Sequence, residues 1–177
     1  MYRGFIRRVR VTTFSDQVVE QLRRAHLAHL RYRGSKHDCE RCPVKPRGCP
    51  NAAALGAIGR ADDGLAEING AMRFAEENDC LWFLPEILRI KGELLSLRAS
   101  ADLTIVADLL YRSLSSARHQ QALYWELCAA TSLAEFMRRQ HKGAEARAVL
   151  GPVYGRFTEG FAAPKVKQAK ALLDQLR

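Results

Sequence analysis

The stretch "LAEFMRRQHKGAEARAVLGPVY", residues 133–154, predicts two helices joined by a tight turn. Its first half ends a longer segment, residues 122–143, whose apolar side chains recur at helical spacing and which stops at a glycine. These apolar residues are Leu123, Leu127, Ala130, Ala134 and Met137. The second helix starts at residue 144 and meets Gly151-Pro152, where we expect a kink or an early end because proline restricts the residue before it. The stretch therefore predicts a helical hairpin.

The same amphipathic pattern continues outward from this hairpin. Apolar side chains at steps of three and four residues predict helices over residues 61–79, 84–98 and 101–120. A truncated helix is predicted at about 51–58, and a last one over 163–177. Strand patterns are weak beyond residue 12, so the body of the chain is predicted to be all-α.

The predicted helices form pairs that resemble one another. Aligned on the small residue where two helices would cross, the second helices place Gly64, Ala107 and Ala146 at equivalent positions, 43 and 39 residues apart. Two helices per repeat and a period near forty are typical of a helical solenoid. We therefore predict a solenoid of about three hairpins, closed by a capping helix at residues 164–176. Its first hairpin is incomplete, so either residues 15–33 or a second chain, as in a homo-oligomer, would cover the exposed end.

The third pair of helices carries a family resemblance. Its large and small residues match the tetratricopeptide (TPR) pattern at Leu133-Ala134, Met137, Ala146 and Leu150. Residues 128–176 further resemble the C-terminal tail of large bacterial signalling ATPases, in which a class III adenylate cyclase or a winged-helix DNA-binding domain precedes a P-loop ATPase and a TPR-like tail. The most specific tracts are Leu150–Phe161 and Lys170–Leu176. The resemblance covers about residues 51–177 and does not extend to residues 1–50.

The resemblance implies a tail without its catalytic domains. The chain has no G-x-x-x-x-G-K-[ST] phosphate-binding loop, no paired aspartates in a strand context for a cyclase, and no helix-turn-helix pattern in its body. No nucleophile–base pair can be argued from spacing, so we expect a protein that is not an enzyme. What the resemblance does imply is a scaffold in signal transduction or transcriptional regulation, with a protein or peptide partner on the concave face of the solenoid.

Charge divides the chain near residue 50. Residues 1–50 contain 12 Lys/Arg and 4 Asp/Glu, whereas residues 51–177 contain 16 and 15. We predict a basic N-terminal segment (1–50) and a helical repeat domain (51–177). Residues 15–34 of the segment predict a helix with an inward apolar stripe, Val18, Val19, Leu22 and Leu30.

The basic segment raises an alternative function, a regulator that binds nucleic acid. Its phosphate contacts would be Arg7, Arg8, Arg10, Arg23, Arg24, Arg31 and Arg33. A solvated basic face, or a helix packed on the first repeat, is the simpler interpretation of such a pattern. We therefore favour a protein partner over nucleic acid.

The same segment crowds its cysteines. In "SKHDCERCPVKPRGCP", residues 35–50, His37, Cys39, Cys42 and Cys49 form a candidate site for a structural zinc ion, because a Cys-x2-Cys pair can fill adjacent corners of a tetrahedron. Known zinc modules usually place their second ligand pair a dozen or more residues away, so a connector with free thiols is the alternative. A shortened gene or a shifted reading frame would also produce the abrupt change near residue 50.

The sequence also predicts a compartment. No run is apolar enough to span a membrane, and the arginine-containing start lacks the apolar core of a secretory signal. Cys80 and Cys128 stand alone in helical surroundings, which suits a reducing environment. We expect a cytoplasmic protein.

Overall fold

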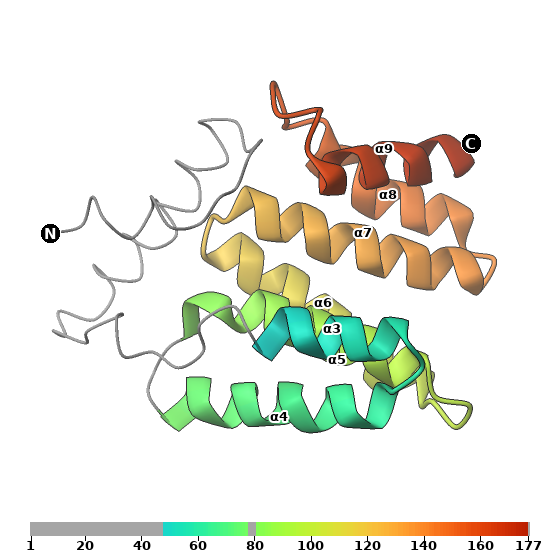
Figure 1. Ribbon diagram of the computed structural model, residues 1–177. Coiled ribbons are helices and arrows are strands. Elements are labelled where there is room, and N and C mark those ends of the chain that lie inside the picture. The colour runs from blue at the N-terminus through green and yellow to red at the C-terminus, as the bar shows by residue number, and fades with distance from the viewer. Residues whose placement is uncertain (1–47, 78–80, 177) are drawn as a thin grey trace, which may run out of the picture.

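The computed structural model of this chain describes residues 48–77 and 81–176, and every regular element in these ranges is helical (Figure 1). A short 3₁₀ turn, Leu81–Phe83, lies directly before the α-helix that starts at Leu84. The α-helices are α3 (Gly48–Ala57), α4 (Ala61–Glu77), α5 (Leu84–Ser96), α6 (Leu103–His119), α7 (Leu123–Arg139), α8 (Gly143–Tyr154) and α9 (Pro164–Gln175). The all-α prediction is therefore confirmed for the described residues, while the helix predicted at residues 15–33 lies outside them.

Several helix boundaries differ from the sequence-based expectation. The helix predicted over residues 122–143 ends at Arg139, and Gly143, expected to end it, is instead the first residue of α8. α3 begins at Gly48, so Cys49 belongs to the first helix of the body. The early end expected at Gly151 does not occur, because α8 continues through Pro152 to Tyr154. Pro152 lies in the last turn of α8, where it lacks the N–H that would donate one helical hydrogen bond, yet the next residue, Val153, is only 2 % exposed. The packing of that last turn holds it helical.

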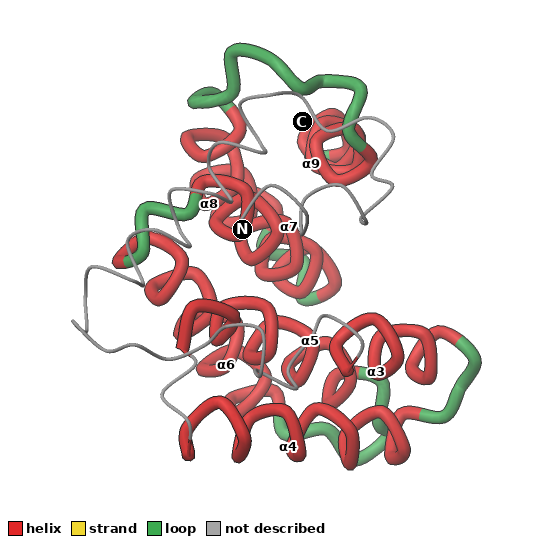
Figure 2. The backbone as a smooth tube through the Cα atoms, turned by 60° about the vertical axis from the view of Figure 1, so that its left-hand side comes forward, coloured by secondary structure: helices red, strands yellow, loops and turns green. Residues whose placement is uncertain are grey.

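The helices form two layers. Neighbours in the chain contact each other as hairpins, α3 with α4, α5 with α6 and α7 with α8. α3, α5, α7 and α9 also contact one another in succession, whereas the described residues give no such contacts among α4, α6 and α8. The odd-numbered helices therefore form one continuous layer, and the even-numbered helices lie outside it (Figure 2).

Three helix ends share one turn geometry. After α3, α6 and α7, the residue beyond the C-cap has a positive φ: Gly59 (82°), Gln121 (55°) and His141 (61°). At the end of α7, the N–H of Lys142 donates to the carbonyl of Met137 at 3.0 Å. This is the Schellman ending, which glycine adopts without strain and other residues adopt at a cost. These short turns bring each following helix back against the one before it.

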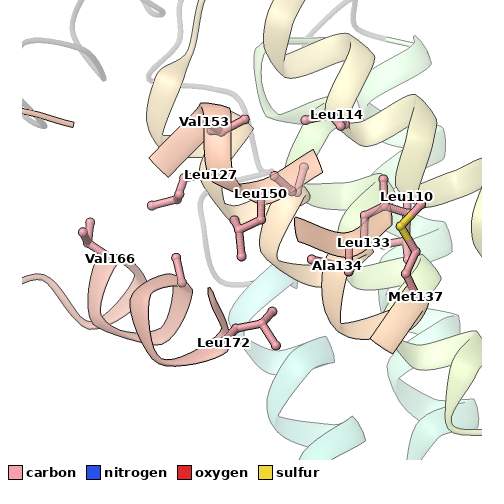
Figure 3. Close-up of a cluster of buried hydrophobic side chains, with 14 of the residues drawn as sticks. Leu110, Leu114, Leu127, Leu133, Ala134, Met137, Leu150, Val153, Val166 and Leu172 are labelled. Atoms are coloured by element: carbon pink, nitrogen blue, oxygen red, sulfur yellow. The ribbon is translucent and has the colours of Figure 1, made fainter. Parts of the chain in front are cut away.

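The largest apolar side chains meet between the layers. Leu110 of α6, Leu127 and Leu133 of α7, Leu150 of α8 and Val166 of α9 are each at most 1 % exposed and form one cluster (Figure 3). A second cluster lies among α3, α4 and α5. Burial of apolar surface stabilises the folded state by about 25 cal/mol for each Å² removed from water. Because each cluster joins helices of different hairpins, no hairpin completes its core alone.

Small residues lie where helices approach closely. A Cβ atom at Gly64 would lie 2.8 Å from the carbonyl oxygen of Ala52, and one at Gly92 would lie 3.1 Å from the side chain of Leu110. Ala146 is fully buried, whereas Ala107 is only half-buried. Of the three residues that align the repeats, Gly64 and Ala146 are therefore closely packed and Ala107 is not.

Candidate binding groove

The odd-numbered layer contains a groove. α3 and α7 each contact α5 but not each other, so α5 forms the floor and the other two helices form the walls. The space between them is about 280 Å³. The lining residues are Ala53, Gly56, Ala57, Ile90, Glu93, Leu94, Ser96, Leu97, Leu110, Thr131, Ser132, Glu135, Phe136, Arg139 and Gln168. Because these residues come from all three hairpins and from α9, only the assembled stack forms the groove.

A buried arginine holds the groove floor to one wall. The Arg89 side chain on α5 is 5 % exposed and donates two hydrogen bonds to the Glu86 carboxylate, from Nε at 2.6 Å and from Nη2 at 2.7 Å. Its Nη1 donates to Glu93, one turn further along α5, and to Ser132 Oγ of α7 at 3.3 Å. Ser132 Oγ in turn donates to Glu93 Oε1 at 2.6 Å. One buried cation thus orients both carboxylates and couples α5 to α7.

The charge of this arginine is stabilised where it lies. Burial by itself lowers the pKa of Arg89, but the hydrogen bonds and charge of Glu86, with the charge of Glu93, outweigh burial and raise that pKa above its usual value. Glu93 differs from Glu86 in exposure, since its side chain is 44 % exposed while that of Glu86 is 14 % exposed. Glu93 Oε2 accepts no hydrogen bond from the described residues. The groove therefore presents one oriented carboxylate oxygen to solvent.

A second carboxylate lies on the α7 wall. Glu135 accepts hydrogen bonds from Arg138 and Arg139, and the bond from Arg138 is the main reason why the pKa of Glu135 lies below its ordinary value. Arg139 also lines the groove and its side chain is 58 % exposed. The rim of the groove is therefore charged, whereas the α5 floor is largely apolar.

Two buried thiols lie in the odd-numbered layer. Burial raises the pKa of Cys49 on α3 to about 12 and that of Cys128 on α7 to about 12, with the charge of Glu86 adding to both effects. Both thiols are free and less than 4 % exposed. They are therefore protonated at neutral pH and poor nucleophiles.

The predicted zinc site is only partly within the described residues. Cys49 lies on α3, while His37, Cys39 and Cys42 lie outside the described ranges. Within residues 48–77 and 81–176, no three His, Cys, Asp or Glu side chains gather in a way that could hold a metal ion. The zinc site stays a prediction. So does the nucleic-acid alternative, because Arg23, Arg24, Arg31 and Arg33 also lie outside the described residues.

A further charged cluster, away from the groove, joins three helical segments. The Glu126 side chain in the first turn of α7 is 4 % exposed, and it pairs with Arg118 near the end of α6 and with Arg156 after α8. The Glu126 Oε1 to Arg118 Nε distance is 3.0 Å. This cluster links the end of α6, the start of α7 and the segment after α8, and both of its arginines are more than half exposed.

The repeat period accounts for contacts that the sequence analysis missed. Ser132 contacts Glu93 and Arg89, which precede it by 39 and 43 residues, so residues one repeat apart lie side by side on adjacent helices of the layer.

No protein-family model matches the chain, and no curated protein or solved structure is significantly similar to it. In the part of the chain that the structure describes, no helix is both long and apolar enough to cross a membrane. The geometry of the groove therefore carries the argument for function.

Proposed function

We propose that this protein is a non-catalytic, TPR-like interaction module whose groove between α3 and α7 takes up a segment of a partner protein. The single observation that carries the proposal is the groove itself, which has an apolar floor and a charged rim and which draws residues from every hairpin. An amphipathic helix or an extended peptide recognises such a surface by placing apolar side chains on the floor and polar ones at the rim.

The repeat character of the helices supports the TPR-like interpretation. The second helices of the hairpins align at a period near forty, as in two-helix repeats. The first helices of the hairpins stack on one another and make one continuous surface, whereas the second helices do not. A solenoid of this kind exposes its inner layer along its whole length, and that layer is the usual place for a ligand that is itself a chain.

The lining of the groove, which comes from helices of all three hairpins, favours a polypeptide. Small-molecule sites usually enclose about 300–1,000 Å³ and cover most of their ligand. The groove encloses about 280 Å³ between helices, close to the lower end of that range. Side chains of a bound segment would enter it, with Ile90, Leu94 and Phe136 as apolar contacts and Glu93 as an acceptor for a basic residue.

The resemblance to the tails of bacterial signalling ATPases suggests what such binding would do. A tail of this type would sense or transmit a regulatory signal by holding a partner segment, without chemistry of its own. The module would therefore act through the affinity and lifetime of a protein complex.

Site-specific photo-crosslinking in cells tests the proposal. A benzophenone amino acid replaces Ala57, which is exposed and lines the groove, and in a matched control it replaces Ala144, which is exposed in the first turn of α8 and does not line it. We expect a partner protein to be captured from position 57 and not from position 144. In the purified pair, Ala57→Arg should weaken the complex about tenfold, equivalent to about 1.4 kcal/mol, while Ala144→Arg should not. Equal capture from both positions, or equal affinities of both variants, would contradict the proposal.

A further inference from the structure

The groove has a chemistry that a segment of this same chain matches. Its exposed carboxylate, Glu93, lies at the edge of an apolar floor that includes Ile90 and Leu94. Among the described residues, the charged side chains that line the groove are Glu93, Glu135 and Arg139, so the lining has one more acidic than basic group; Glu93 also pairs with the buried Arg89, and Arg139 pairs with Glu135. An occupant that fits should therefore combine an apolar stripe with positive charge.

Residues 15–33 have this combination in their sequence. The apolar stripe predicted for them (Val18, Val19, Leu22 and Leu30) would meet the floor, and arginines cover the other faces of the predicted helix. They belong to a segment with 12 basic and 4 acidic residues, whereas residues 51–177 are nearly neutral. No other part of the chain has such an excess of positive charge.

Chain length allows this segment to reach the groove. The described structure starts at Gly48, the first residue of α3, and α3 forms one wall of the groove. The 13 residues between Gly34 and Gly48 can span up to about 45 Å, while the ten residues of α3 measure about 15 Å. Ala53 and Ala57, the small side chains of the α3 wall, would let a helix approach closely.

We propose that residues 15–33 occupy the groove between α3 and α7 in the isolated protein and compete there with the partner segment. This inference rests on the proposed function, because it assigns a second occupant to the same surface. A tethered segment acts at an effective concentration of about 1 mM, so even a weak intrinsic dissociation constant of about 100 μM keeps the groove about nine-tenths occupied. Such occupancy lowers the apparent affinity for a partner about tenfold, and displacement of the segment restores it.

Crosslinking of the purified full-length chain, with no partner present, tests the proposal. The benzophenone group is placed at position 57 or at the control position 144, and unlabelled protein is mixed with isotope-labelled protein so that crosslinks within one chain differ in mass from crosslinks between chains. We expect crosslinks from position 57 to residues 15–33 within one chain, and none from position 144. Added salt should reduce their yield moderately, because the segment is basic and the lining of the groove has one more acidic than basic side chain.

Leu22 and Gln17 of the segment provide a matched pair of variants. Gln17 lies about 140° around the predicted helix from Leu22 and at least about 100° from every residue of the apolar stripe, so an aspartate at position 17 adds the same charge away from the docking face. Leu22→Asp should weaken docking about 100-fold and so lower the crosslink yield about tenfold, whereas Gln17→Asp should leave the yield unchanged. Mixed-isotope crosslinks would show that a second copy fills the groove, and equal effects of the two variants would show that no face is recognised. Either result overturns the proposal.

The two proposals fail separately. If residues 15–33 give no crosslink in the purified protein but a partner is captured from position 57 in cells, only the self-docking proposal is wrong. If no protein is captured from position 57 in cells, even in the Leu22→Asp variant that frees the groove, the proposed function is wrong.

Discussion

Replacement of Arg89 by alanine probes the interaction that joins the groove floor to its wall. The guanidinium is 5 % exposed and bonds to Glu86 through two nitrogens and to Glu93 through a third. Removing one partner of a buried ion pair costs about 3–5 kcal/mol, because the remaining charge is left without compensation. Glu86 is 14 % exposed and Glu93 is 44 % exposed, so water can partly replace the arginine. We therefore expect a loss near the lower limit, about 3 kcal/mol.

Urea unfolding followed by circular dichroism measures this loss. With a slope of about 2 kcal/mol per M, the midpoint should fall by about 1.5 M. Arg138→Ala is the matched control, because it removes an arginine whose side chain is 41 % exposed from its pair with Glu135, and it should leave the urea midpoint nearly unchanged. The double variant Arg89→Leu, Glu86→Leu should recover most of the loss, since both charges are then absent. Equal losses for Arg89→Ala and Arg138→Ala would refute the assignment of a buried cation.

Three further predictions concern turns, close packing and thiols. His141→Gly should raise the free energy of unfolding by about 1 kcal/mol, because glycine adopts the positive φ of 61° without strain, and a decrease would show that the turn is not left-handed. Gly64→Ala should destabilise the fold by about 1–3 kcal/mol, because the added Cβ would lie 2.8 Å from a carbonyl oxygen. Gly70→Ala adds a Cβ that meets nothing within 4 Å, so it should stabilise α4 by about 0.5–1 kcal/mol. Equal losses of stability in the two variants would contradict the close approach of α3 and α4. Burial raises the pKa of Cys128 from 9.0 to about 12, so its contribution to stability is complete below pH 9 and declines as the pH rises towards 12, by up to about 1.4 kcal/mol per pH unit. Unfolding measured between pH 8 and 11 should therefore show a shallower decline in Cys128→Ala than in the unmodified protein.

The helical hairpins were predictable because their signal is local. Apolar side chains at steps of three and four residues mark every helix from α4 to α9. Gly143 was predicted to end the helix before it, but it is the first residue of α8. The left-handed residues Gln121 and His141 were not predicted as such, since neither is glycine. Their conformation follows from the short connections that the stacked helices require.

The buried charges were harder to predict because their partners are distant in sequence. Glu86, Arg89 and Glu93 stand three and four residues apart on α5, a spacing that indicates ion pairing but not burial. Burial depends on Ser132, which reaches Arg89 only when the hairpins stack. Glu126 likewise pairs with Arg118 and Arg156 across segment ends that only the fold brings together. The groove follows from the arrangement of three helices and has no local sequence pattern.

The central claim is that the groove between α3 and α7 is a docking surface for a polypeptide. The most direct test is the ratio of partner captured from position 57 to partner captured from position 144 in cells, with the same crosslinker and the same expression level. The account predicts that capture from position 57 exceeds capture from position 144 by at least about tenfold and is lost when Glu93→Lys reverses the exposed charge of the groove. Equal capture from the two positions would contradict it.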